Sequence, residues 1–138
     1  MGLYLAVFQD EDELEGVEVG SYADFGVFRD TVSDRLENGK AGNRFPTLML
    51  HSDCDGSWLP EDAVRLQEEL RQIANEFQGL PPLESTPGSW QSEVARSLGI
   101  KPKNLYESFF DVDGEPLIER LVQLTQISQE HGREICFQ

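Results

Sequence analysis

Two stretches of the chain decide the expected fold: Thr47-Leu48-Met49-Leu50-His51-Ser52-Asp53-Cys54-Asp55-Gly56 and Tyr106-Glu107-Ser108-Phe109-Phe110-Asp111-Val112-Asp113-Gly114. In each stretch an apolar run breaks into Asp-x-Asp-Gly, and a proline, Pro60 or Pro116, then opens a segment with helical periodicity. A strand that ends in a turn before a helix is where α/β proteins display functional groups. The two stretches therefore predict carboxylates at the ends of strands.

The rest of the chain also shows strand and helix patterns. Apolar runs predict strands, and apolar spacings of three and four residues predict helices. Strands are expected at residues 3–8, 47–52, 106–110 and 134–137, and helices are expected to begin at Ser21, Pro60, Trp90 and Pro116. Two alternatives stay open: a helical turn over residues 104–108, and a short hairpin in which Val17 and Val19 pair with the first strand.

The expected order is β-α-β-α-(α)-β-α-β. It predicts one α/β domain over residues 1–138, with about four strands in a mostly parallel or mixed sheet covered by three to four helices. If the strands run parallel, three acidic clusters leave the same edge of the sheet: residues 10–18, Asp53 with Asp55, and Asp111 with Asp113. An acidic recognition site at this edge follows from that geometry.

The chain is strongly acidic. Its 26 Asp and Glu residues outnumber 11 Lys and Arg, the formal net charge is −15, and residues 1–28 contain seven acids without a Lys or Arg. Such a charge repels nucleic acids and anionic membranes, because proteins bind these through Lys and Arg. It favours a basic protein partner and accelerates the encounter with it. An acidic housekeeping domain, charged only for solubility, is the alternative interpretation.

The composition indicates a cytoplasmic protein. Cys54 and Cys136 are too few for a disulfide framework and are interpreted as reduced thiols. No apolar run approaches the ~20 residues that span a bilayer. The first residues lack the basic segment of a secretory signal peptide.

The Asp-x-Asp-Gly turns are compared first with the EF-hand, whose calcium loop needs acidic ligands at its first and last positions. In the first copy the opening position falls on His51. In the second copy the opening position falls on Phe109 and the closing position on Arg120. Neither copy has the ligands that an EF-hand requires.

The segment 109–114 also looks like the first motif of haloacid-dehalogenase-type phosphotransferases. In those enzymes the first Asp is the nucleophile, the second is the acid/base and Mg²⁺ offsets charge, which would assign these roles to Asp111 and Asp113. Only 24 residues follow Gly114, too few to supply the later Lys and the acidic metal ligands. A Mg²⁺-dependent phosphohydrolase is kept as the enzymatic alternative, and no metal or cofactor is predicted.

Two further roles suit the aspartates, and they do not exclude each other. An Asp at the end of a strand can cap the following turn through its side chain, and the Gly supplies a positive φ angle. The same carboxylates can also contact a protein partner. Trp58 and Trp90 each follow a Ser in a loop-like sequence, and each is interpreted either as a core residue or as an interface anchor.

Four stretches, in this order, span nearly the whole chain: Gly16–Phe25, Leu50–Gly56, Trp90–Ser97 and Phe110–Glu115. Together they resemble the immunity protein 70 family of bacterial polymorphic toxin systems. The resemblance implies a non-enzymatic protein that is made beside a toxin gene, binds the toxin and protects the producing cell. It carries over no catalytic residues to this chain.

The expected partner is therefore a cognate toxin, bound through an acidic surface. Many nuclease toxins are basic because they hold nucleic acid, and an acidic inhibitor can occupy their site as a phosphate mimic. The candidate contact residues are Asp53, Asp55, Trp58, Trp90, Asp111 and Asp113.

Overall fold

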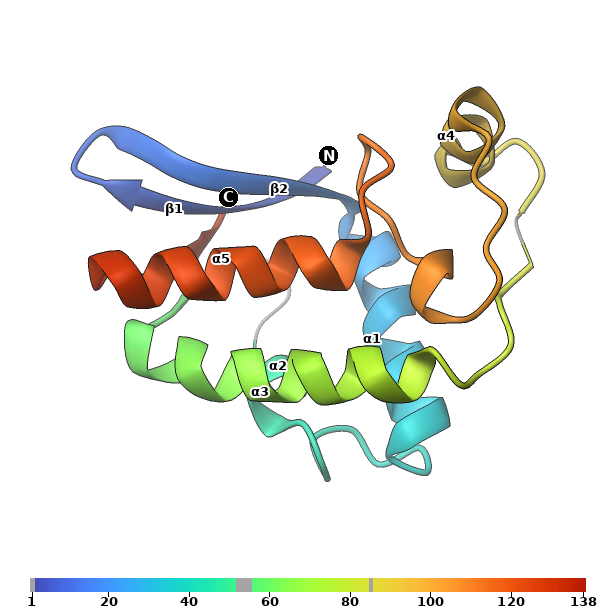
Figure 1. Cartoon of the computed structure of the whole chain (residues 1–138). Coiled ribbons are helices and arrows are strands. Elements are labelled where there is room, and N and C mark those ends of the chain that lie inside the picture. Colours follow the sequence, from blue (N-terminus) through green and yellow to red (C-terminus); the bar gives the residue numbers. More distant parts are fainter. Residues whose placement is uncertain (1, 52–55, 85) are drawn as a thin grey trace.

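The structure is a computed structural model, and it describes residues 2–51, 56–84 and 86–138. Strands, α-helices and one 3₁₀ turn follow one another along this part of the chain (Figure 1). Their order is β1 (Gly2–Gln9), β2 (Asp12–Ser21), α1 (Tyr22–Leu36), α2 (Pro46–Met49), β3 (Ser57–Trp58), α3 (Pro60–Phe77), α4 (Trp90–Leu98), η1 (Tyr106–Ser108), α5 (Leu117–His131) and β4 (Ile135–Phe137).

The four strands form an antiparallel sheet in the order β2-β1-β4-β3. The expected mostly parallel or mixed sheet is wrong, and so is the expected element order. The possible hairpin with Val17 and Val19 is confirmed and extends over the whole of β1 and β2. Only a tight turn joins these two strands, with Asp10 in a left-handed conformation at φ 58°. A connection this short can join only antiparallel strands, whereas parallel strands need a long crossover.

The expected strand at 47–52 is wrong where residues 46–49 are helical, and of the two alternatives near residue 106 the helical turn is confirmed. Residues 46–49 form the short helix α2, and residues 106–108 form η1, followed by an isolated bridge between Phe110 and Pro116. A short apolar run does not distinguish a strand from a buried helical turn. In α2 a residue distant in the sequence favours the helix. The Glu69 carboxylate of α3 accepts hydrogen bonds from the N–H groups of Thr47 and Leu48 in the first turn.

The longer helices follow their sequence signals. At the start of α1, Ser21 and Asp24 form a capping box: the Ser21 hydroxyl accepts from the Asp24 N–H, and the Asp24 carboxylate accepts from the Ser21 N–H. Gly99 ends α4 and Gly132 ends α5, both in the left-handed conformation that favours glycine. The expected helices at Pro60 and Trp90 are confirmed.

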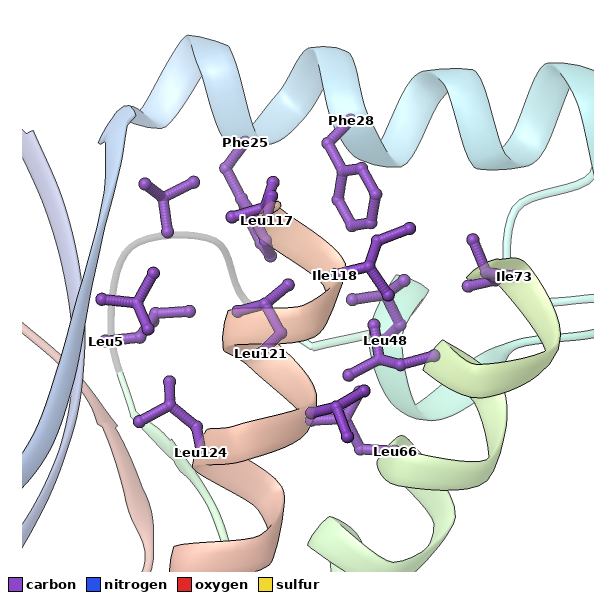
Figure 2. Close-up of a cluster of buried hydrophobic side chains, with 14 of the residues drawn as sticks. Leu5, Phe25, Phe28, Leu48, Leu66, Ile73, Leu117, Ile118, Leu121 and Leu124 are labelled. Atoms are coloured by element: carbon purple, nitrogen blue, oxygen red, sulfur yellow. The ribbon is translucent and has the colours of Figure 1, made fainter. Parts of the chain in front are cut away.

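The helices α1, α3 and α5 lie on one side of the sheet, with α4 standing apart at one end (Figure 1). Between these helices and the sheet lies one hydrophobic cluster, to which β1, α1, α2, α3 and α5 all contribute (Figure 2). We call the side of the sheet that faces this cluster the inner face, and the opposite side the outer face. In the part of the chain that the structure describes, no helix is long and apolar enough to cross a membrane.

Candidate partner-binding site

Asp53 and Asp55, the acids of the first Asp-x-Asp-Gly turn, lie outside the described residues. Trp58, which follows that turn, is only 2% exposed. Its indole Nε1 donates to the carbonyl of Thr47 at 3.0 Å, and its ring packs edge-on against Phe137. Trp58 therefore lies in the core, and its indole N–H is hydrogen-bonded within the chain.

The second Asp-x-Asp-Gly turn is built around Asp111. This side chain is 1% exposed, and its Oδ1 accepts hydrogen bonds from the N–H groups of Asp113 and Glu115, each at 3.0 Å. Its Oδ2 faces Arg120 Nε at 3.3 Å. Both carboxylate oxygens are thus engaged within the chain, which fits the turn-stabilising role and not an exposed nucleophile. Asp113 is exposed and free to face a partner.

Arg120 of α5 connects that turn to the hairpin of β1 and β2. Its guanidinium donates to the carbonyl of Gly16 at 2.8 Å and lies 3.3 Å from the carboxylate of Glu15 as well as from that of Asp111. Burial alone would lower the pKa of Arg120, but the two carboxylates raise it overall. Arg120 thus links the Asp111 turn and α5 to β2.

Trp90, at the first position of α4, is half-buried and tied to α1. Its Nε1 donates to Asp24 Oδ2 at 2.9 Å, and the amide of Gln91 donates to Asp24 Oδ1 at 2.8 Å. Burial would raise the pKa of Asp24, but the hydrogen bonds from the Ser21 N–H, Trp90, Gln91 and the Ser21 hydroxyl lower it overall. The spacing of Ser21 and Asp24 is a local helix-start signal, but nothing in the sequence links Asp24 to α4.

A groove of about 300 Å³ runs beside Trp90, between α4 and the body of the molecule. Its lining is mainly apolar and includes Val27, Leu83, Phe109, Phe110 and Leu117. Three of the four stretches that carry the family resemblance meet here. Asp24, in the stretch 16–25, accepts a hydrogen bond from Trp90, in the stretch 90–97. The Trp90 ring packs edge-on against Phe110, in the stretch 110–115.

The outer face carries a second group of side chains, which sequence reasoning missed. By register it presents Tyr4, Ala6 and Phe8 of β1, Glu13, Gly16 and Glu18 of β2, Ser57 of β3 and Cys136 of β4. The available signal was the alternation in β1, where Leu3, Leu5 and Val7 are fully buried and point to the inner face. Their neighbours Tyr4 and Phe8 are only half-buried.

The two acidic clusters that lie in the described residues, 10–18 and Asp111 with Asp113, do not converge in the way that a parallel sheet required. The hairpin turn at residues 10–12 lies at one end of β2, and the turn at Asp111 meets the strand near the other end, where the Val112 N–H donates to the Glu18 carbonyl at 3.4 Å. Asp12 and Glu18 are separated by about 20 Å along the strand, at ~3.3 Å per residue. The acids therefore line β2 and the outer face instead of gathering at one edge. Across residues 2–51, 56–84 and 86–138, no group of three or more His, Cys, Asp or Glu side chains is arranged to hold a metal ion.

Comparison with known proteins places these features in a family. Searches among curated proteins and among solved structures found no match to the chain. A family model described as Immunity protein 70 matches residues 3–137. This match covers nearly all of the chain, including the hairpin, the Asp111 turn and the Trp90 helix, so the protein belongs to the immunity protein 70 family.

Proposed function

We propose that this immunity protein neutralises a cognate toxin by binding a basic surface of that toxin, in the cytoplasm of the producing cell. Family membership implies a toxin partner, and the charge of the chain indicates which kind of partner fits. The observation that carries the proposal is the concentration of uncompensated acids on the hairpin of β1 and β2.

Six acidic residues lie between positions 10 and 18, in β2 and in the turn before it. Among the described residues, cations pair with only two of them: Arg120 lies 3.3 Å from Glu15, and Arg133 lies 3.8 Å from Asp10. The other four, Glu11, Asp12, Glu13 and Glu18, are exposed and form no ion pair with a described residue.

Such a surface attracts a positively charged protein and can raise its association rate by about 10–1,000-fold at low salt. A toxin that holds nucleic acid has a basic active site, which an array of carboxylates can occupy. Asp113 and Trp90, at least partly exposed beside the hairpin, remain proposed contacts. Trp58 and Asp111 are engaged in the interior and take no part in the proposed surface.

The direct test is to co-express the chain with the toxin domain encoded by the neighbouring gene, and to titrate the purified pair at rising NaCl concentration. We expect co-expression to restore growth, and we expect the affinity to fall by about tenfold or more between about 50 and 500 mM NaCl, because salt screens exposed charges. Absence of protection and of binding would overturn the proposed function. An affinity that is unchanged by salt would overturn its electrostatic basis.

A further inference from the structure

We propose that the outer face of the sheet is the surface on which the toxin docks, with a Lys or Arg side chain of the toxin lying across Tyr4 and Phe8 between glutamates. This inference rests on the proposed function and assigns it to one side of the molecule. It makes the outer face the main contact, with Asp113 and Trp90 at its margin, and differs from docking inside the groove that Trp90 lines at the end of the sheet.

The outer face has an aromatic centre. The Tyr4 ring lies over Gly16, where an added Cβ would meet the phenol oxygen at 1.9 Å, so this strand position admits only glycine while Tyr4 stays in place. Ala6, between the two aromatic residues on β1, is fully buried although no described helix covers this side. Side chains that neighbour Ala6 on this face therefore cover it.

A depression lies beyond Phe8, where the outer face meets the start of α3 and the end of α5. This shallow depression of about 440 Å³ is lined by Phe8, Cys136, Leu59 and Pro60 together with Asp10, Gly132, Arg133 and Glu134. Leu59 is 45% exposed, which is high for a leucine beside other apolar groups. The depression provides room beside the aromatic centre for the aliphatic part of a partner side chain.

Carboxylates surround this centre. Glu13 lies opposite Phe8 on β2, Glu18 lies opposite Tyr4, and Glu134 accepts a hydrogen bond from Ser57 Oγ at 2.6 Å on the far side. Burial, a hydrogen bond to Glu13 and the charges of Glu13, Glu15 and Glu18 raise the pKa of Tyr4 to about 12. Burial and then Glu134 raise the pKa of the Cys136 thiol. Tyr4 in the centre and Cys136 beside it therefore both lie near negative charges.

This chemistry selects a cationic protein over the other occupants. A second copy of the chain, itself at −15, would bring the same glutamates together, and nucleic acids and anionic membranes would be repelled. A Lys or Arg side chain gains a cation–π contact with an aromatic ring and a charge-assisted hydrogen bond to a carboxylate at the same time.

The test compares two double charge reversals that change the net charge equally, from −15 to −11. One variant, Glu13→Lys with Glu18→Lys, alters the outer face. The matched control, Asp30→Lys with Asp34→Lys, alters two exposed acids of α1 on the helix side. With the neighbouring gene's toxin domain as the probe at about 100 mM NaCl, we expect the outer-face variant to bind at least about 30-fold more weakly and the control to change by less than about threefold.

A second variant keeps the inference testable if the charge reversal does not fold. Phe8→Ser leaves the charge unchanged, and we expect it to weaken binding by about tenfold. Equal effects of the two charge reversals, or unchanged binding by Phe8→Ser, would overturn docking at the outer face while leaving toxin binding intact. If the wild-type chain does not bind the toxin at all, the proposed function itself fails. Dimerisation that Phe8→Ser abolishes would assign the face to a second copy and overturn the inference.

Discussion

The two faces of the same sheet differ in what covers them. On the inner face, Leu3, Leu5 and Val7 are fully buried against α1 and α5, and the space between them is filled by aliphatic and aromatic side chains. On the outer face, Tyr4 and Phe8 of the same strand are half-buried beneath no helix and stand among glutamates. The inner side of β1 thus stabilises the fold, and its outer side is available to bind a partner. Substitutions on the two sides should separate these properties.

The largest loss of stability is expected at Phe28, at the centre of the helix layer. Phe28 is fully buried and packs against Phe25, Phe77 and Phe109. Phe28→Ala leaves a cavity and should lower the free energy of unfolding by about 3–5 kcal/mol in urea denaturation. Toxin affinity of the protein that remains folded should not change, and a loss of affinity in that fraction would contradict the separation of the two faces.

A paired substitution at adjacent positions sharpens the comparison. Val7→Ser buries a hydroxyl on the inner face and should cost about 3 kcal/mol of stability. Phe8→Ser removes a larger side chain from the outer face, yet it should cost only about 1 kcal/mol, because the ring is already partly in water. Chemical denaturation of both variants measures this difference. If Phe8→Ser proves the more destabilising, the outer face is covered in solution.

A smaller loss of stability is expected at Gly114, in the turn that contacts α4. Gly114 has φ +82°, and an added Cβ would lie 2.4 Å from Leu98 Cδ1 of α4. Gly39 has a similar φ of +78° with nothing within 4 Å, so it is the matched control for backbone strain. Gly39→Ala should cost about 1 kcal/mol and Gly114→Ala about 1 kcal/mol more.

We expect Gly114→Ala, but not Gly39→Ala, to accelerate hydrogen exchange of the last α4 amides, because only the substitution at Gly114 forces the Leu98 side chain away from the turn. Equal costs at the two glycines would mean that the contact of the turn with α4 contributes nothing.

The smallest effect is expected from Asp24, and it depends on pH. Because the folded state lowers the pKa of Asp24, its carboxylate stabilises the fold above about pH 4, and this contribution is lost as the pH falls through the folded-state pKa. Asp24→Ala should therefore cost about 1 kcal/mol at pH 7 through loss of the cap, and less at about pH 2–3.

Thermal unfolding of the wild type and Asp24→Ala at both pH values measures that difference, with Asp30→Ala, an exposed acid of the same helix, as the control. A stability difference between the wild type and Asp24→Ala that is the same at both pH values would show that the charge of Asp24 does not stabilise the fold.

Local sequence signals predicted most helices correctly, because the residues that decide them are close in the chain. Ser21 with Asp24, Pro60 and Gly99 each act within one helical turn of the boundary that they mark. The sheet was predicted wrongly because strand direction depends on the length of the connections. The apolar run at 47–52 predicts a strand wrongly, because the Glu69 carboxylate that accepts hydrogen bonds from the α2 backbone lies more than twenty positions away.

In the candidate site, too, the sequence predicted the local contacts and missed those between distant residues. The Asp-x-Asp-Gly pattern correctly indicated a side-chain-capped turn at Asp111, since its acceptors and donors are local. Its burial depends on Arg120 of α5, and the core position of Trp58 depends on Phe137 at the other end of the chain. The alternation of Tyr4 and Phe8 was visible in the sequence, but which side of the sheet the helices cover was not.

Hydroxyl-radical footprinting of the complex with the toxin domain tests the central claim most directly, because it reports on side chains one by one. If the toxin docks on the outer face, oxidation of Tyr4, Phe8 and Cys136 should fall by about fivefold or more on binding. Val27 and Leu98, which are 51% and 58% exposed near the α4 groove, should be oxidised as in the free protein. Protection of Val27 and Leu98 with unchanged oxidation of Tyr4 and Phe8 would contradict the account.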